Sequence, residues 1–340
     1  MFSTTEQVRE LFNSFERLRV LIVGDVMIDS YLKGSVDRIS PEAPVPVILL
    51  HHREDLLGGA ANVALNVKSL GAKPILCSVI GNDAQGAEFI KLLEKSSIDK
   101  RGIIQASSRI TTTKYRVIGN KMQMLRVDHE TDLDLDEEVE KLAFKRINEL
   151  IISEKPDVII LQDYNKGMLT APLIGKIIQL AGDKNIQVVV DPKRKNFAAY
   201  HSIALFKPNL KEIREGLKIE IDPKSEESLR KAAEFIHSRQ DAENVMITLS
   251  EDGVFVSHRN GSSYDSSVIK AHIRNIADVS GAGDTVISVA ALCMAAGLSP
   301  VLLAGLANLA GGLVCEQVGV VPVNKKALLD EAVSLLTINH

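Results

Sequence analysis

The chain has 340 residues, 45% of them hydrophobic and 25% charged, and its net charge is −4 at pH 7. This length and apolar content suit one large α/β domain or two smaller ones. The weak negative charge, the absence of Trp and an aromatic content of 4% argue against a nucleic-acid-binding surface. The N-terminus lacks an apolar leader and no apolar run reaches the ~20 residues of a membrane span. With three cysteines scattered through apolar segments, the sequence predicts a cytoplasmic protein.

Strand and helix patterns alternate along most of the chain. A short amphipathic helix at 6–18 precedes a buried strand at 19–24, a helix at 60–70, a strand at 73–81 and a helix at 83–96. A charged helix at about 136–154 leads to strands at 157–162, 186–190, 203–207 and 244–249, interleaved with helices. The pattern closes with a hairpin around Asn260-Gly261 and two last helices at 281–296 and 300–317. This alternation predicts a doubly wound, mostly parallel sheet with helices on both faces.

Two segments depart from this rhythm. Residues 31–50 contain three prolines and have no helical period, and residues 111–128 hold two β-rich runs around Gly119-Asn120. Such runs around a short polar turn are typical of a hairpin. We expect the two segments to form a small separate β-sheet, a lid, inserted in a single domain that spans residues 1–340.

Polar side chains follow nearly every predicted strand of the α/β part. They are Asp25, Asp29, Asp163, Lys166, Asp191, Lys193, Asn209, Glu212, Ser250 and Glu251. Because the carboxyl ends of parallel strands meet at one edge of the sheet, where ligands bind, we expect one crevice there. Asp29 is the preferred ligand of the first group, since Asp25 and Asp163 equally suit the capping of turns.

The stretch Ala277–Thr285 (ADVSGAGDT) leads into an apolar helix. Gly281 and Gly283 carry no Cβ, and a helix N-terminus attracts anions, so a phosphoryl group fits here. Asp284 lies in the same positive field and is expected to be ionised at neutral pH. A base beside a phosphoryl site suits phosphoryl transfer to a hydroxyl. A glycine-rich helix start with an acidic cap is the alternative interpretation.

Two glycine-rich motifs, Gly58-Gly-Ala-Ala-Asn62 and Asp278-Val-Ser-Gly-Ala-Gly-Asp284, resemble the signatures of the ribokinase-like sugar kinases of the phosphofructokinase-B type. Asn209-Leu-Lys-Glu212 resembles their N-x-x-E element, and the likeness runs from about residue 18 to 322. Within that family, residues 38–47, 163–167, 190–193 and 248–253 are similar to the D-glycero-β-D-manno-heptose 7-phosphate kinases of lipopolysaccharide core synthesis. The chain stops at His340 without a nucleotidyltransferase-type HxGH motif, which resembles the stand-alone form of that kinase.

The resemblance implies transfer of a phosphoryl group from ATP to O1 of the heptose 7-phosphate, with Mg²⁺ and a monovalent cation left open. It implies that Asp284 is the general base and that Gly281, Ala282 and Gly283 form the anion hole, with Gly283 also near the nucleotide. It implies sugar contacts from Asp29, Gly58, Gly59 and Asn62, nucleotide contacts from Ser250, Glu251, Gly253 and Asn308, and Mg²⁺ contacts through water from Asn209 and Glu212. The lids would pair two subunits, and separate phosphatase and adenylyltransferase enzymes would follow in the pathway.

An acceptor that already carries a phosphate also needs cationic side chains. Lys193 is the favoured candidate because it follows a strand, and Lys166, Lys114, Arg116 and Arg126 stay open between ligand contacts and surface charges. Arg194 and Lys195 fit either a phosphorylated acceptor or solvated surface, and Asp191 either orients Lys193 or binds sugar. Two alternatives remain at this point: a kinase for another sugar or sugar phosphate, and a non-catalytic sugar-binding regulator on the same fold.

Overall fold

A nine-stranded sheet forms the centre of the computed structural model, which describes residues 2–337. Its order is β13-β12-β11-β10-β9-β8-β1-β4-β5, and only β12 and β13 run antiparallel to their neighbours. The strands are β1 (Arg19–Gly24), β4 (Lys73–Gly81), β5 (Ile103–Ala106), β8 (Val158–Gln162), β9 (Gln187–Asp191), β10 (Ile203–Phe206), β11 (Ala242–Thr248), β12 (Val254–Asn260) and β13 (Ser263–Ile269). The predicted doubly wound sheet is confirmed.

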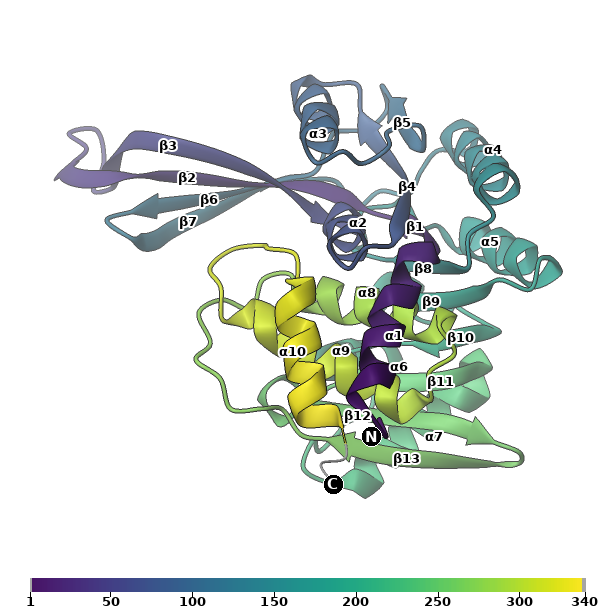
Figure 1. The fold of residues 1–340 in the computed structure, drawn as a ribbon. Coiled ribbons are helices and arrows are strands. Elements are labelled where there is room, and N and C mark those ends of the chain that lie inside the picture. The colour runs from purple at the N-terminus through teal and green to yellow at the C-terminus, as the bar shows by residue number, and fades with distance from the viewer. Residues whose placement is uncertain (1, 338–340) are drawn as a thin grey trace.

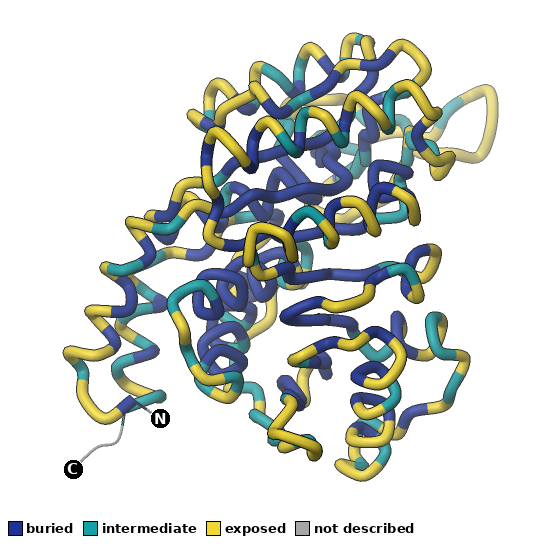
Figure 2. Tube along the Cα trace, turned by 90° about the vertical axis from the view of Figure 1, so that its right-hand side faces the viewer, coloured by how far each residue is buried: buried dark blue, intermediate teal, exposed yellow. Residues whose placement is uncertain are grey.

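Helices cover both faces of this sheet because successive strand residues point to opposite sides. Val20 and Ile22 of β1 join one core, with α1 (Thr5–Ser14), α2 (Ala60–Ser69), α3 (Ala84–Lys95), α8 (Ala282–Ala295), α9 (Pro300–Cys315) and α10 (Lys325–Leu336). Leu21 and Val23 join the other, with α4 (Glu137–Glu154), α5 (Ala171–Asp183), α6 (Leu210–Leu217) and α7 (Glu226–Gln240). Figure 2 shows buried residues running through the middle of the molecule and exposed residues on its outer turns. None of the helices within residues 2–337 is long and apolar enough to cross a membrane.

The strand order reverses at β1, and this reversal places the site. From β1 the chain moves to β4 and β5 on one side, then returns to β8 on the other side. The loops that leave the carboxyl ends of β1 and β8 therefore diverge to opposite faces and leave a crevice between them. Asp25 follows β1 at this point, and Asp163 follows β8.

A second sheet of four strands projects from the body as a long ribbon (Figure 1). Its order is β3-β2-β6-β7, formed by β2 (Val26–Ile39), β3 (Pro46–Gly59), β6 (Thr113–Gly119) and β7 (Met122–His129). The small separate sheet was predicted, but its strands run further than residues 31–50. The hairpin turn is at Asn120-Lys121, both with positive φ, one residue later than predicted.

Two elements were not predicted from the sequence. Strand β5 has four residues, too few to display a period. Helix α10 begins after Asn324, whose side chain accepts the N–H of Ala327 at 2.9 Å, and it buries only Leu328 and Ala332. Leu329, Val333 and Leu336 also pack against the core, so the helical period was present in the sequence and was missed.

Candidate active site

Asp284 lies in the first turn of α8, below the glycines that begin this helix. Gly281 has a φ of 80°, a left-handed value that favours glycine, and a Cβ there would lie 2.8 Å from the Asn62 Nδ2. The Asp284 side chain is 3% exposed, whereas Gly283 is exposed. A ligand over the helix start would therefore meet the backbone of Gly283 with the carboxylate beneath it.

Three side chains from three elements hold the Asp284 carboxylate. Asn62 of α2 donates to Oδ2 at 2.9 Å. Gln162 at the end of β8 donates to Oδ1 at 3.1 Å, and the Tyr164 hydroxyl donates to the same oxygen at 2.6 Å. Three separate stretches of the chain thus meet at one carboxylate: residues 58–62, 162–164 and 281–284. This fits the prediction that they lie at one edge of the sheet.

Burial raises the pKa of Asp284 to about 7, although hydrogen bonds from Tyr164 and Asn62 lower it; the nearby Asp191 raises it further. The carboxylate was expected to stay ionised at neutral pH, whereas a pKa of about 7 leaves it only partly ionised there. The positive end of a helix favours the charged form, but the loss of water around a carboxylate within the core outweighs that field.

Asp191 and Lys207 form a buried ion pair next to this turn. Lys207 Nζ lies 3.1 Å from Asp191 Oδ2 and both side chains are almost fully buried, while Gln162 donates to the same oxygen at 3.1 Å. A Cβ on Gly283 would lie 3.9 Å from both members of the pair. Asp191 thus pairs with Lys207 and not with Lys193, one of its two predicted partners.

Asp29 begins the lid side of the site. Its buried carboxylate forms an ion pair with Arg116 of β6, and the Arg116 guanidinium lies over the Tyr31 ring, 5.1 Å from its centroid. A Cβ on Gly58 would overlap the Asp29 carboxylate, so a glycine is required there. Gly59, with a φ of 60°, caps α2 beside the backbone of Asp25.

Asp25 holds the loop that carries Tyr164. Its carboxylate accepts the backbone N–H groups of Tyr164 at 2.8 Å, Lys166 at 3.1 Å and Met168 at 2.9 Å. Burial and the neighbouring Asp163 raise its pKa to about 6, although these hydrogen bonds lower it. Asp25 thus caps the turn of this loop. Turn capping was one of its two predicted roles, the other being ligand contact.

Lys193 lies between the Tyr164 ring and α6. Its ammonium is 5.4 Å from the ring centroid and pairs with Glu212. Glu212 accepts the backbone N–H of Asn209 at 2.8 Å and donates its own N–H to the Asn209 side chain at 2.9 Å, a capping box at the start of α6. Burial lowers the pKa of Lys193, but Asp191 and Glu212 outweigh it and raise the pKa above its usual value.

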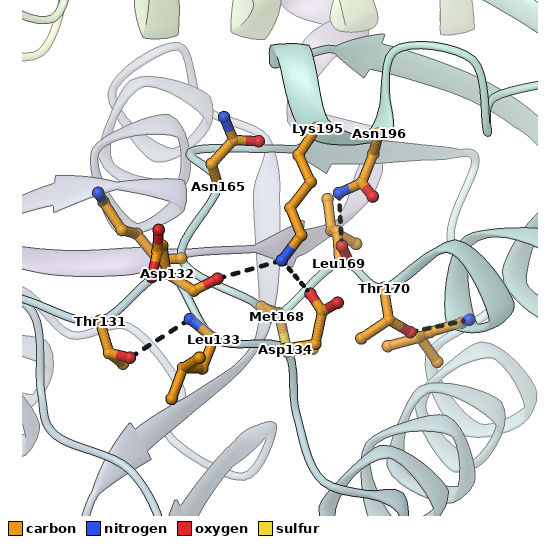
Figure 3. Close-up of polar contacts among 12 residues, drawn as sticks. Thr131, Asp132, Leu133, Asp134, Asn165, Met168, Leu169, Thr170, Lys195 and Asn196 are labelled. Carbon is orange, nitrogen blue, oxygen red and sulfur yellow. Dashed lines mark hydrogen bonds and ion pairs between the residues drawn. The ribbon is translucent and has the colours of Figure 1, made fainter.

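The segment 130–135, which returns from the lid to α4, is held by lysine side chains, and Figure 3 shows the contacts of Lys195 with it. Glu130 accepts from Lys166 at 2.7 Å and from Lys114 of β6 at 2.8 Å. Lys195 donates to the Asp132 carbonyl at 3.1 Å and to the Asp134 carboxylate at 2.9 Å. Lys195, which the sequence left open between an acceptor contact and solvated surface, is partly exposed and contacts this segment.

The predicted nucleotide residues lie at the ends of β11 and β13. Ser250 and Glu251 are exposed on a short 3-10 turn that follows β11. Gly253 has a φ of 101° and touches the backbone of residues 269–271. Asn308 of α9 donates to the Lys270 carbonyl at 3.0 Å in the same place.

Buried polar atoms without a hydrogen-bond partner gather around the candidate site. Within residues 2–337, five of seven such side-chain atoms belong to β2, to the ends of β8 and β9 or to the loop after β8: those of Ser30, Tyr31, Gln162, Asn165 and Asp191. Such atoms are rare in folded proteins, and each is accounted for by strain, function or a bound molecule. Gln162 Oε1 and Asp191 Oδ1 are both acceptors, so a ligand rich in hydroxyl donors would satisfy them.

Three residues of the site were not singled out from the sequence: Gln162, Tyr164 and Lys207. Each follows or ends a predicted strand, so the rule that selected Asp191 and Lys193 could also have selected them. Gln162 and Lys207 end apolar strands, where a single polar residue is difficult to distinguish from a strand boundary. Tyr164 lies inside a motif that drew attention through its charged residues.

A glycine-led helix start above a buried carboxylate, at the carboxyl edge of a doubly wound sheet, suits a phosphotransferase that acts on a hydroxyl. Residues 17–327 match the family model described as pfkB family carbohydrate kinase. The chain therefore belongs to the PfkB family and is a carbohydrate kinase.

Curated relatives are similar over nearly the whole chain. The protein named "Bifunctional protein HldE" of Methylobacillus flagellatus is 39% identical over 312 residues, which are 92% of this chain and 62% of that protein. The protein of the same name in Aliarcobacter butzleri is 40% identical over 301 residues, which are 88% of this chain and 61% of that protein. The chain thus spans about three fifths of the length of these relatives.

Solved structures share the fold at low sequence identity. Phosphofructokinase-2 from Escherichia coli, in complex with potassium, has a TM-score of 0.74 at 17% identity, with 94% of this chain and 99% of that chain covered. Ribokinase from Arabidopsis thaliana, complexed with ribose and ATP, has a TM-score of 0.67 at 16% identity, with 92% and 98% covered. The ribokinase-like fold expected from the sequence is confirmed.

Proposed function

We propose that this carbohydrate kinase transfers the γ-phosphoryl group of ATP to O1 of D-glycero-β-D-manno-heptose 7-phosphate, giving the 1,7-bisphosphate. The observation that carries the chemistry is the buried Asp284 carboxylate beneath the exposed backbone of Gly283. The choice of acceptor rests on the heptose-kinase-like stretches of the sequence and on the relatives named HldE, at 39% and 40% identity.

In this proposal Asp284 takes the proton from the acceptor hydroxyl. The hydroxyl oxygen bonds to the γ-phosphorus, the bond from that phosphorus to the ADP oxygen breaks, and ADP leaves with the electron pair. The backbone of Gly281, Ala282 and Gly283 would stabilise the charge on the transferring group, as donors at a helix start do. With a pKa of about 7, Asp284 can take and release a proton near neutral pH.

The proposed acceptor site extends from the body to the lid. Asp29, Gly58, Gly59, Asn62 and Asp191 would meet the sugar hydroxyls. The acceptor's phosphate would bind among Arg116, Lys166 and Lys193. Each of these cations is paired with a carboxylate, so a phosphate would exchange one anionic partner for another rather than enter an unneutralised pocket.

The proposed nucleotide site uses Asn209, Ser250, Glu251, Gly253, Gly283 and Asn308. Within residues 2–337 no group of three His, Cys, Asp or Glu side chains is arranged to hold a metal ion. Both Glu212 oxygens already accept hydrogen bonds, which fits contact with Mg²⁺ through its waters, together with Asn209, rather than direct ligation. Bound Mg²⁺ would neutralise charge on the phosphates. Comparing rates in K⁺ and in Na⁺ tests the dependence on a monovalent cation, which the sequence left open.

We also propose that two copies pair through their lids. The lid exposes large apolar side chains, among them Leu49, Met122 and Leu125, and such a patch on a soluble protein marks an interaction surface. Phosphatase and adenylyltransferase activities would act on the product in turn.

The test is ATP turnover with a panel of acceptors: the heptose 7-phosphate, fructose 6-phosphate and ribose. The proposal expects the highest kcat/KM for the heptose 7-phosphate. Asp284→Asn is expected to lower kcat about 10³-fold, the usual contribution of a general base, while Asp330→Asn, the same change at an exposed position, leaves it unchanged. Near wild-type turnover by folded Asp284→Asn would contradict the base, and a preference for fructose 6-phosphate or ribose would contradict the acceptor.

A further inference from the structure

The two oxygens of the Asp284 carboxylate have different surroundings. Oδ1 accepts two hydrogen bonds, from the Tyr164 hydroxyl at 2.6 Å and from Gln162 Nε2 at 3.1 Å. Oδ2 accepts one, from Asn62 Nδ2 at 2.9 Å. A carboxylate oxygen has about two lone-pair sites, so Oδ1 is fully used and Oδ2 has one site left.

We infer that Tyr164 is a positioning residue that, with Gln162, occupies Oδ1 of Asp284 and leaves Oδ2 as the oxygen that receives the acceptor's proton. The inference rests on the proposed role of Asp284 as base. In the transfer step the acceptor O–H bond breaks and an Oδ2–H bond forms, while the oxygen attacks phosphorus and ADP leaves. Both donors to Oδ1 remain in place, because the proton arrives on the other oxygen.

Tyr164 is well fixed for this role. Its backbone N–H is held by the Asp25 carboxylate at 2.8 Å, and its ring lies beneath the Lys193 ammonium at 5.4 Å. The hydroxyl is a donor only as long as it keeps its proton. Burial, then the charges of Asp284 and Asp191, raise the pKa of Tyr164 well above its usual value, so it stays protonated throughout the working pH range.

The charged groups around Asp284 come from several elements. Asp191 raises its pKa and Lys193 lowers it, and Lys207 lies on the far side of Asp191. These charges are unaltered when the Tyr164 hydroxyl is removed. The hydrogen bond from Tyr164 lowers the pKa of Asp284, because it favours the charged form. Loss of that bond must therefore raise the pH at which the base becomes ionised.

The experiment compares pH profiles of kcat/KM for wild type and Tyr164→Phe with ATP and the heptose 7-phosphate, or with the best acceptor of the panel if that one fails. Tyr164→Phe is expected to move the acid limb up by about one pH unit, because the lost hydrogen bond favoured the charged form of Asp284. The rate on the alkaline plateau should fall less than about tenfold, because the base itself remains. An unmoved acid limb in the folded variant would overturn the inference.

Tyr200→Phe is the matched control. Tyr200 is another buried tyrosine, and its hydroxyl donates to a carboxylate, Asp163, at 2.8 Å. Its loss should lower stability and leave the acid limb where it is. An equal shift in Tyr200→Phe would mean that the limb follows general loosening of the loop, and the inference would be wrong.

Two further measurements cover the remaining outcomes. Gln162→Met removes the other donor to Oδ1 and should move the acid limb in the same direction. If Tyr164→Phe does not fold, this variant tests the inference in its place. A ¹³C-carboxyl NMR titration, with Asp284→Asn to assign the signal, measures the shift without turnover. If Asp284→Asn is inactive and the limb does not move, only this inference fails; if Asp284→Asn is active, the proposed base fails.

Discussion

The large sheet buries its apolar side chains, whereas part of the small sheet exposes them. In the large sheet β8 and β10 are buried at every residue, with helices on both faces. In the small sheet every residue from Met122 to Val127 on β7 is exposed, including Met122 at 69% and Leu125 at 56%. Helices on both faces cover the apolar side chains of the large sheet. The ribbon projects beyond these helices, so only another surface could cover its exposed apolar side chains. The body thus covers its own apolar side chains, and the exposed apolar side chains of the lid support the proposed pairing of two copies.

The largest predicted loss of stability follows from a substitution in the body. Asp25→Ala leaves three backbone N–H groups of the Tyr164 loop without their acceptor. We expect a loss of about 3 kcal/mol in the free energy of unfolding, since each unpaired buried donor costs roughly 1–3 kcal/mol and relief of the buried charge offsets part of the sum. Urea denaturation measures it. A loss no greater than that of Asp330→Ala, at an exposed position, would contradict the role given to Asp25.

A smaller effect is expected in the lid, on association rather than on folding. Leu125→Glu places a charge among the exposed apolar side chains of β7, and it should convert a dimer to a monomer in sedimentation equilibrium. The free energy of unfolding of the monomer should change by less than about 0.5 kcal/mol, as for most surface substitutions. Leu142→Glu makes the same change on the exposed face of α4 and should leave the mass unaltered. A dimer that survives Leu125→Glu would mean that the lids do not pair in this way.

The smallest effect is expected for the exposed charges of the lid. Arg126 pairs with Asp128 at 2.9 Å, but its side chain is 55% exposed, and water screens such a pair. Arg126→Ala should change the free energy of unfolding by less than about 0.5 kcal/mol and leave the acceptor's KM unchanged. A large rise in KM would instead place Arg126 in the phosphate site and make this end of the lid part of the acceptor pocket.

The sequence was sufficient to predict those parts of the structure that depend on a repeated or local pattern. Alternating buried strands and helices predicted the large sheet, and Gly281–Asp284 predicted a helix start at the right residue. It was insufficient where the outcome depends on which distant side chains meet. The ionisation of Asp284 was judged from the helix end, which is local, but burial against α2 and β8 decides it. One predicted partner of Asp191 was Lys193, two residues away, but its ion pair is with Lys207, which follows the next strand, β10.

Strand β2 connects the base of the ribbon, at the body, with its tip. It has 14 residues, roughly 45 Å when extended, and it pairs with β3 from Val26–Gly59 at the base to Ile39–Pro46 at the tip. Asp29 and Gly58 lie near the base, where the ribbon leaves the body, and Arg116 on β6 is in register with Tyr31 beside them. The base of the ribbon therefore carries residues that the proposed function assigns to the acceptor. If two copies pair through their lids, the paired strands β2 and β3 would connect that contact to Asp29 and Gly58.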